Sequence, residues 1–193
     1  MGLLSTLVFT GWAARTASRS AKAAEDAVEA LPTIERAYLF PEITNSDAIG
    51  AVIIAATGGT FAPGAPPAGI AGAQHTAEVS FKIKNFGKTP AVLKRVSAEL
   101  GIAPLKSQLV LPIQNPVLGP HEETRSFNRA MERGLTQEEA FRISTLTAQI
   151  ALVGAVTFDD IWGRHWETRF HYGWDTSTNS FTLHSVWTEE VKG

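Results

Sequence analysis

The stretch that decides the fold is residues 149–172, which read QIALVGAVTFDDIWGRHWETRFHY. Residues 149–158 and 164–172 each have the composition of a strand, and residues 159–163 connect them. Along the second strand two sets of side chains alternate: Trp166, Thr168, Phe170 and Tyr172, and then His165, Glu167, Arg169 and His171. Because successive side chains of a strand point to opposite faces, the first set predicts a core face and the second a solvent face.

Similar alternation marks strands earlier in the chain. Residues 34–40 predict a strand that Pro41 ends, because proline cannot donate to a β-ladder. Residues 76–84 predict the clearest strand. Its core face carries four apolar side chains, Ala77, Val79, Phe81 and Ile83.

Three further segments complete the set of strands. Residues 91–100 predict a strand whose core face carries Val92, Val96, Ala98 and Leu100. Leu93 breaks this alternation and marks a bulge. A turn that begins at Leu118 leads into a short strand within 117–127, and residues 181–187 form the last strand.

Helical signals are few after residue 32. Thr136 and Glu139 fit a capping box, which predicts a short helix over 137–144. Residues 48–56 form an apolar segment, and residues 58–72 are rich in Gly, Pro and Ala, which predicts a flexible loop near 58–74. About seven antiparallel strands and one minor helix predict a mainly β fold, an immunoglobulin-like β-sandwich preceded by one long N-terminal α-helix.

The amino terminus predicts a membrane attachment. Residues 2–14 carry no charge, yet thirteen helical residues span only about 20 Å against about 30 Å of hydrocarbon. A membrane-inserted end is the favoured interpretation, with Trp12 as an interfacial anchor. A signal peptide and an apolar helix packed on the domain are the alternatives.

Residues 13–31 predict a helix that Pro32 ends. Its charges recur on one stripe, at Arg15, Arg19, Lys22, Asp26 and Glu29. A solvated stalk is favoured over a dimerising coiled coil, because the opposite stripe is mostly alanine. Residues 1–32 are therefore interpreted as anchor and stalk, and residues 33–193 as the β-sandwich domain. Basic residues come first after the apolar run, which places the domain on the cytoplasmic side, with the periplasm as the alternative.

Composition excludes several classes of function. The 193 residues contain 17 Lys and Arg against 19 Asp and Glu, so binding of nucleic acid by bulk electrostatics is not expected. The chain has no Cys, which excludes disulfides, thiolate metal sites and a cysteine nucleophile.

The chain resembles a group of uncharacterised bacterial membrane-anchored proteins. The motifs that carry the resemblance are IERAY at residues 34–38, the Asn-x-Gly-x-x-Pro-Ala turn with Asn85, Gly87, Pro90 and Ala91, the sequence Leu118-Gly119-Pro120, and Asp160 with Gly163. The resemblance covers nearly the whole chain. It implies an immunoglobulin-like sandwich on a helical anchor, and it implies no activity.

The segment around Gly87 has a structural interpretation. Gly87, Lys88 and Thr89 do not fit a phosphate-binding loop, because position 82 is Lys rather than Gly and Pro90 prevents a following helix. The expected roles are those of a turn: Asn85 bonds to the following backbone, Gly87 adopts a positive φ, and Pro90 fixes the return.

No catalytic, cofactor or metal site is predicted. His165 and His171 lie about 20 Å apart along one strand, too far to share an ion. Trp166 and Trp187 belong to an aromatic cluster in which Trp162 and Trp174 lie in connections, so these last two are the candidate ligand or partner contacts. The predicted function is a non-enzymatic, membrane-tethered domain that binds a protein partner or supports an envelope assembly. The alternative is a small-molecule or glycan-binding sandwich that uses its exposed Trp residues.

Overall fold

The computed structural model describes residues 22, 25, 36–57, 76–105 and 108–191. The chain divides into two compact units, Met1–Arg36 and Ala37–Gly193. In the first unit, Lys22 and Glu25 are helical. The predicted membrane segment at 2–14, the rest of the predicted stalk, and the predicted loop near 58–74 lie outside the described residues. None of the described helices is both long enough and apolar enough to span a bilayer.

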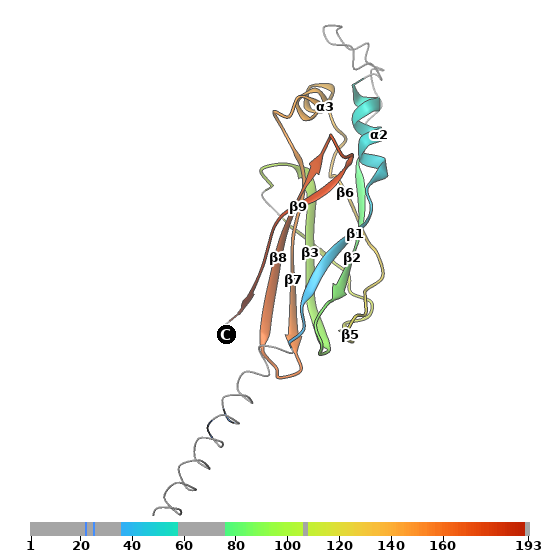
Figure 1. Ribbon diagram of the computed structural model, residues 1–193. Helices are drawn as coiled ribbons and strands as arrows, with labels where there is room; N and C mark the ends of the chain where they lie inside the picture. Colours follow the sequence, from blue (N-terminus) through green and yellow to red (C-terminus); the bar gives the residue numbers. More distant parts are fainter. Residues whose placement is uncertain (1–21, 23–24, 26–35, 58–75, 106–107, 192–193) are drawn as a thin grey trace, which may run out of the picture. The chain divides into compact units, whose positions relative to one another are not determined.

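The described part of the second unit is mainly β, as the sequence predicts. Its elements in chain order are β1 (Leu39–Asn45), α2 (Asp47–Ala56), β2 (Glu78–Asn85), β3 (Ala91–Ile102), β4 (Leu109–Leu111), β5 (Val117–Leu118), β6 (Phe127–Ala130), α3 (Gln137–Ser144), β7 (Ile150–Asp160), β8 (His165–Asp175) and β9 (Ser180–Glu190). One sheet has the order β1-β2-β6, and the other has the order β4-β3-β7-β8-β9 with β5 also paired to β3. All of these pairs are antiparallel (Figure 1).

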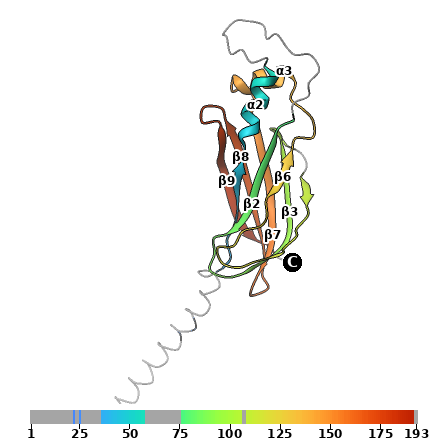
Figure 2. The same cartoon turned by 90° about the vertical axis from the view of Figure 1, so that its right-hand side faces the viewer.

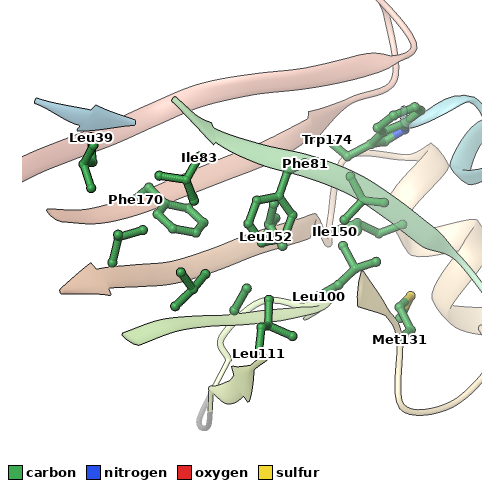
Figure 3. Packing of buried hydrophobic residues seen from close by; sticks show 14 of the residues in the cluster. Leu39, Phe81, Ile83, Leu100, Leu111, Met131, Ile150, Leu152, Phe170 and Trp174 are labelled. Atoms are coloured by element: carbon green, nitrogen blue, oxygen red, sulfur yellow. The ribbon is translucent and has the colours of Figure 1, made fainter. Parts of the chain in front are cut away.

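The two sheets share one hydrophobic core. Figure 3 shows Phe81 and Ile83 of β2 facing Phe170 of β8 and Leu152 of β7, and all four side chains are buried. The rings of Phe81 and Phe170 lie 6.1 Å apart, so the contact joins the two sheets directly. The alternation predicted for β2 and β8 is therefore confirmed.

The bulge predicted in the strand after Ala91 is also confirmed. The pairing of β3 with β7 shifts between Leu93 and Arg95. Leu93 is buried before the shift and Val96 is buried after it, whereas Val92 is only half-buried. Val92 was expected on the core face, and that expectation is wrong because the bulge reverses the alternation on its N-terminal side.

Two other elements differ from the sequence prediction. Pro41 does not end the first strand but lies inside β1, paired with Ile83. β1 is the edge strand of its sheet, and proline is tolerated there because its nitrogen faces away from the neighbouring strand. The buried residues of this segment are Ala37, Leu39 and Pro41, so these three side chains form its core face. The apolar segment after Ser46 forms the helix α2.

The predicted helix at 137–144 is confirmed with the same bounds. Thr136 accepts a hydrogen bond from the backbone of Glu139, and the Glu139 side chain bonds back to the Thr136 backbone. Helices α2 and α3 contact each other at one end of the strands in both views (Figure 1 and Figure 2). The β2–β3 turn and the β7–β8 connection lie at the other end, where Ala91 pairs with Asp160.

Candidate functional site

The turn after β2 is built around a buried amide. The side chain of Asn85 is fully buried, and its Nδ2 donates to the carbonyl oxygens of Thr89 (2.8 Å) and Gly119 (3.1 Å). Its Oδ1 accepts the backbone N–H of Gly87 at 2.9 Å, which is the predicted bond to the following backbone. Because the amide joins two separate turns, Asn85 has a structural role rather than a ligand-binding one.

Gly87 does not adopt the expected positive φ. Among the described glycines that conformation occurs at Gly163, with φ of 73°. The Asn85 side chain closes the turn without a left-handed residue, so the expectation for Gly87 was wrong. Gly87 is buried within the turn, and Pro90 is exposed at its end.

Trp162 lies at the tip of the β7–β8 connection and is 39% exposed. The connection is fixed by Asp160, whose Oδ1 accepts the backbone N–H groups of Trp162 (2.9 Å) and Arg164 (3.0 Å). The other carboxylate oxygen accepts the indole N–H of Trp166 at 3.0 Å. The buried carboxylate of Asp160 is therefore used within the hairpin, and it holds Trp162 at the surface.

Trp174 lies at the opposite end of β8 and not in a connection as expected. It is 3% exposed and packs edge-on against Phe181, with ring centroids 5.4 Å apart. About ten strand residues separate it from the Trp162 hairpin, a distance of roughly 30 Å. The two candidate tryptophans therefore do not line one pocket.

A groove of about 560 Å³ crosses the outer face of the larger sheet. Short side chains form its floor, Ser97 of β3 and Ala155 of β7, which are neighbours in the ladder. Arg95 stands beside the floor, and Arg169 and Trp187 pair across β8 and β9. Trp187 is 46% exposed, so it is the tryptophan of the predicted cluster that offers a ring surface to a ligand in this groove. We call this surface the outer groove.

The carboxylates near the outer groove already have cationic partners. Glu167 pairs with Arg169, whose Nη2 also lies 3.6 Å from Glu189. Glu99 pairs with Arg129 at 3.0 Å, and both side chains are nearly buried. Arg95 is exposed and forms no ion pair with any residue that the structure describes. The lining of the outer groove holds Arg95 and Arg169 against the one carboxylate of Glu167, since Glu189 lies outside the lining, so the lining has one cation in excess.

Asp159 lies near the end of β7, outside the outer groove. Its carboxylate forms ion pairs with Lys94 at 2.8 Å and with His165. Burial acts to raise the pKa of Asp159, but hydrogen bonds from Lys94 and His165 outweigh it and lower the pKa. This carboxylate is therefore ionised and paired, and it adds no free negative charge to the sheet face.

His171 lines the outer groove, but its ring nitrogen Nε2 is not exposed there. Its Nε2 is buried and has no hydrogen-bond partner among the described residues. Burial lowers the pKa of His171, and the neighbouring His184 lowers it further. The lowered pKa favours the neutral form of His171 at pH 7, and burial keeps its Nε2 out of reach of a ligand in the groove.

Metal binding has no candidate within the described residues, where no group of three His, Asp or Glu side chains converges. His165 begins β8 and His171 lies six residues further along it, a separation of about 20 Å as the sequence indicates. Asp159 instead pairs with His165 and with Lys94.

Sequence reasoning did not find the outer groove. Nothing in the sequence around Arg95 indicates a site. Trp187 was assigned to an aromatic cluster but was not predicted to be a ligand or partner contact. The groove forms only when the register places Arg95 near Arg169 through β7, although 74 residues separate them in the chain. The cross-strand neighbours on the solvent face can be identified only when that register is known.

Comparisons with known proteins show a similarity of structure but not of sequence family. No protein-family model and no curated protein matches the sequence. Among solved structures, the chain is similar to the X-ray structure of Northeast Structural Genomics Consortium target SoR45. The two are 11% identical, the match covers 84% of this chain and 91% of that one, and the TM-score is 0.32.

Proposed function

We propose that the protein is a non-enzymatic, membrane-tethered domain that binds the acidic segment of a protein partner in the outer groove. The observation that carries this proposal is one groove that holds the unpaired Arg95 on β3 and the exposed ring of Trp187 on β9, three strand spacings or about 14 Å apart across the sheet. Tryptophan and arginine are the residue types that most often dominate binding energy at protein interfaces. The cation at Arg95 favours a carboxylate on the partner, and the Trp187 ring favours an apolar side chain elsewhere on the same segment.

The ion pairs around the groove support a binding role rather than a catalytic one. Glu167, Glu189 and Asp159 each lie against a cation, so each of these carboxylates already has a partner. A general acid or base instead needs a pKa close to the working pH and a free path to the substrate. The immunoglobulin-like arrangement is part of the same proposal, supported by two antiparallel sheets around one core.

The tether is proposed from the sequence of residues 2–14, which are uncharged and apolar. We assign the domain to the cytoplasmic side, because Arg15, Arg19 and Lys22 follow the apolar run. A reporter enzyme fused to the carboxyl terminus tests this side. An enzyme active only in the periplasm should stay inactive, and its activity would assign the domain to the periplasm.

The partner is tested by cross-linking in cells. The photoreactive residue p-benzoylphenylalanine at position 187 should give one cross-linked protein of defined size, and the same residue at exposed Phe141 should not give that product. Arg95→Glu should abolish the product at 187, because it reverses the surplus charge. Lys88→Glu is the matched control, since Lys88 is exposed and outside the groove. A product unaffected by Arg95→Glu would reject the groove as the binding surface.

The glycan-binding alternative has one observation in its favour. Ser97, Gln108 and Ser185 place hydroxyl and amide groups in the lining of the same groove as the exposed Trp187, and sugars need both kinds of contact. Soluble oligosaccharides that compete away the cross-link at 187 would favour this alternative. Persistence of the cross-link in their presence would favour the protein partner.

A further inference from the structure

The register of the larger sheet arranges the outer groove in rows that cross its strands (Figure 1). One row, which we call the floor row, consists of cross-strand neighbours from β3 to β9: Ser97, Ala155, Arg169 and Trp187. The row beside it, which we call the charged row, consists of Arg95, Thr157, Glu167 and Glu189. Residues of one strand that share a face are two positions apart, so the two rows run side by side at a spacing of about 7 Å.

The floor row forms an open channel. Ser97 and Ala155 have short side chains, and the long side chain next to them in this row belongs to Arg169. Arg169 pairs with Glu167 and lies 3.6 Å from Glu189, and both carboxylates belong to the charged row. These ion pairs draw the guanidinium of Arg169 toward the charged row, so the channel stays open along the floor row.

The width of the channel favours an extended chain. Its wall opposite the charged row is formed by Val153 and His171, which are paired neighbours on β7 and β8. This wall and the charged row are four residues apart along each strand, or about 13 Å between Cα atoms. Side chains of both walls occupy part of that width, whereas an α-helix with its side chains needs about 10–12 Å. The channel therefore fits an extended segment and excludes a helix.

The length of the channel sets a spacing. Three strand spacings, about 14 Å, separate Ser97 from Trp187. An extended segment presents every second side chain to the same face, at separations of about 7, 13 and 20 Å. The separation of about 13 Å fits, so two side chains four residues apart reach the two ends. Arg95 lies about 7 Å from Ser97 along β3, a distance that its long side chain can span.

The charges around the β3 end of the channel favour an anion. Arg95 is exposed and forms no ion pair with any described residue. Lys94 before it is held by Asp159 at 2.8 Å. The carboxylate of Glu99 faces the same end from β3, but it is paired with Arg129 at 3.0 Å. Among the described residues at this end, the charge without a partner is therefore positive, and it is complementary to a carboxylate.

We propose that the partner segment binds along the floor row as an extended chain, with an acidic side chain over Ser97 that pairs with Arg95. A large apolar side chain four residues away packs on Trp187, and the side chain midway between the two lies closest to Ala155. This inference rests on the proposed function, because it specifies the segment that the outer groove binds. The partner should carry an acidic and a large apolar residue with three residues between them.

The test titrates fluorescein-labelled peptides with the full chain and measures fluorescence anisotropy. One peptide, Thr-Asp-Thr-Val-Thr-Phe-Thr, has the required spacing. A second, Thr-Asp-Thr-Val-Phe-Thr-Thr, has the same composition with Asp and Phe three residues apart, which places them on opposite faces of an extended chain. Both are also made with Asp and Phe exchanged, to cover the two chain directions. In one direction the first spacing should bind about tenfold more tightly than the second.

Variants of the groove separate the contacts. Arg95→Gln should weaken binding of the Asp peptide and leave an otherwise identical Asn peptide unaffected, because only the former carries the charge. Ala155→Leu should abolish binding, because it fills the channel while Arg95 and Trp187 stay in place. Ala155→Ser is the matched control and should bind as the unchanged protein does.

The outcomes distinguish this inference from the proposed function. The cross-link at position 187 can depend on Arg95 while both peptide spacings bind equally, or while no peptide binds in a way that depends on Arg95. The outer groove then remains the binding surface, and the extended segment with its four-residue spacing is wrong. If the cross-link is also independent of Arg95, the proposed function fails and this inference fails with it.

Discussion

The hydroxyl of Tyr172 donates to the main-chain carbonyl of Pro41 at 2.6 Å, and this bond joins β8 of the larger sheet to β1 of the smaller one. The bond also occupies the free edge of β1 at Pro41, where proline offers no N–H. An added strand therefore finds neither a donor nor a free acceptor at this position, which protects the edge from aggregation.

Tyr172→Phe should lower the free energy of unfolding by about 1–2 kcal/mol, because it leaves the Pro41 carbonyl without its donor. Burial raises the pKa of Tyr172, and the charge of Glu42 raises it further. A pKa raised on folding contributes stability that is present below the unfolded value of about 10 and lost as the pH rises through the folded value. Urea unfolding from pH 7 to pH 11 measures both effects. Equal unfolding midpoints for the two proteins at pH 7 would contradict this role.

Asn85→Ala should destabilise the domain by about 2–4 kcal/mol, because buried carbonyls lose the amide that joins two turns. Asn128→Ala is the matched control. Asn128 accepts one exposed hydrogen bond from Ser80, and its loss should change stability by less than about 0.5 kcal/mol. Thermal unfolding of the two variants gives the comparison. Similar losses in both would mean that Asn85 does not join the turns.

Helix α3 should lose stability in acid, because Glu139 is part of its capping box. The hydrogen bond from Arg133 is the main cause that lowers the pKa of Glu139 to about 2, and bonds from Thr136 assist it. A lowered folded pKa contributes stability above the unfolded value near 4.5, and this stability is lost as the pH falls towards 2. Glu139→Gln should make the free energy of unfolding depend less on pH between 4.5 and about 2. Glu138→Gln removes an equal charge from the same turn and should leave the profile unchanged; an identical response in both variants would count against the capping box as the cause.

Gly154→Ala should destabilise the domain by about 1–3 kcal/mol through overpacking. A Cβ at this position would overlap the ring of Phe170 and the main-chain carbonyl of Ser97 on the neighbouring strand. Gly163→Asn is the comparison, since no atom lies within 4 Å of a Cβ there and Asn tolerates the positive φ. Chemical denaturation should show the larger loss for Gly154→Ala. The reverse order would contradict the close approach of β3 and β7.

Strands with one buried face could be predicted from the sequence, because alternation shows directly at Val79, Phe81 and Ile83, and again in β8. The capping box of α3 could also be predicted, because Thr136 and Glu139 lie close together in the sequence. Helix α2 was not identified, since its sequence DAIGAVIIAA is apolar on every side and carries no period. The position of Pro41 inside β1 depends on that strand being an edge, which is a property of the sheet.

The candidate site could not be predicted for a similar reason. Trp162 and Trp174 look alike in the sequence, yet one lies at a hairpin tip and the other packs against Phe181. The outer groove depends on the register of β3, β7, β8 and β9, which local patterns do not contain. The charge excess in the groove becomes visible only when the residues that line it are known.

The central claim is that an apolar tether holds a binding domain at a membrane, and salt-washed membrane fractions test it most directly. The full chain should remain in the membrane pellet at high salt, because apolar attachment is insensitive to ionic strength. Leu3→Asp with Leu7→Asp should release it, whereas Ser18→Asp with Ser20→Asp, an equal charge change in the predicted stalk, should not. A full chain that stays in the supernatant, or one that both double variants release equally, would contradict the account.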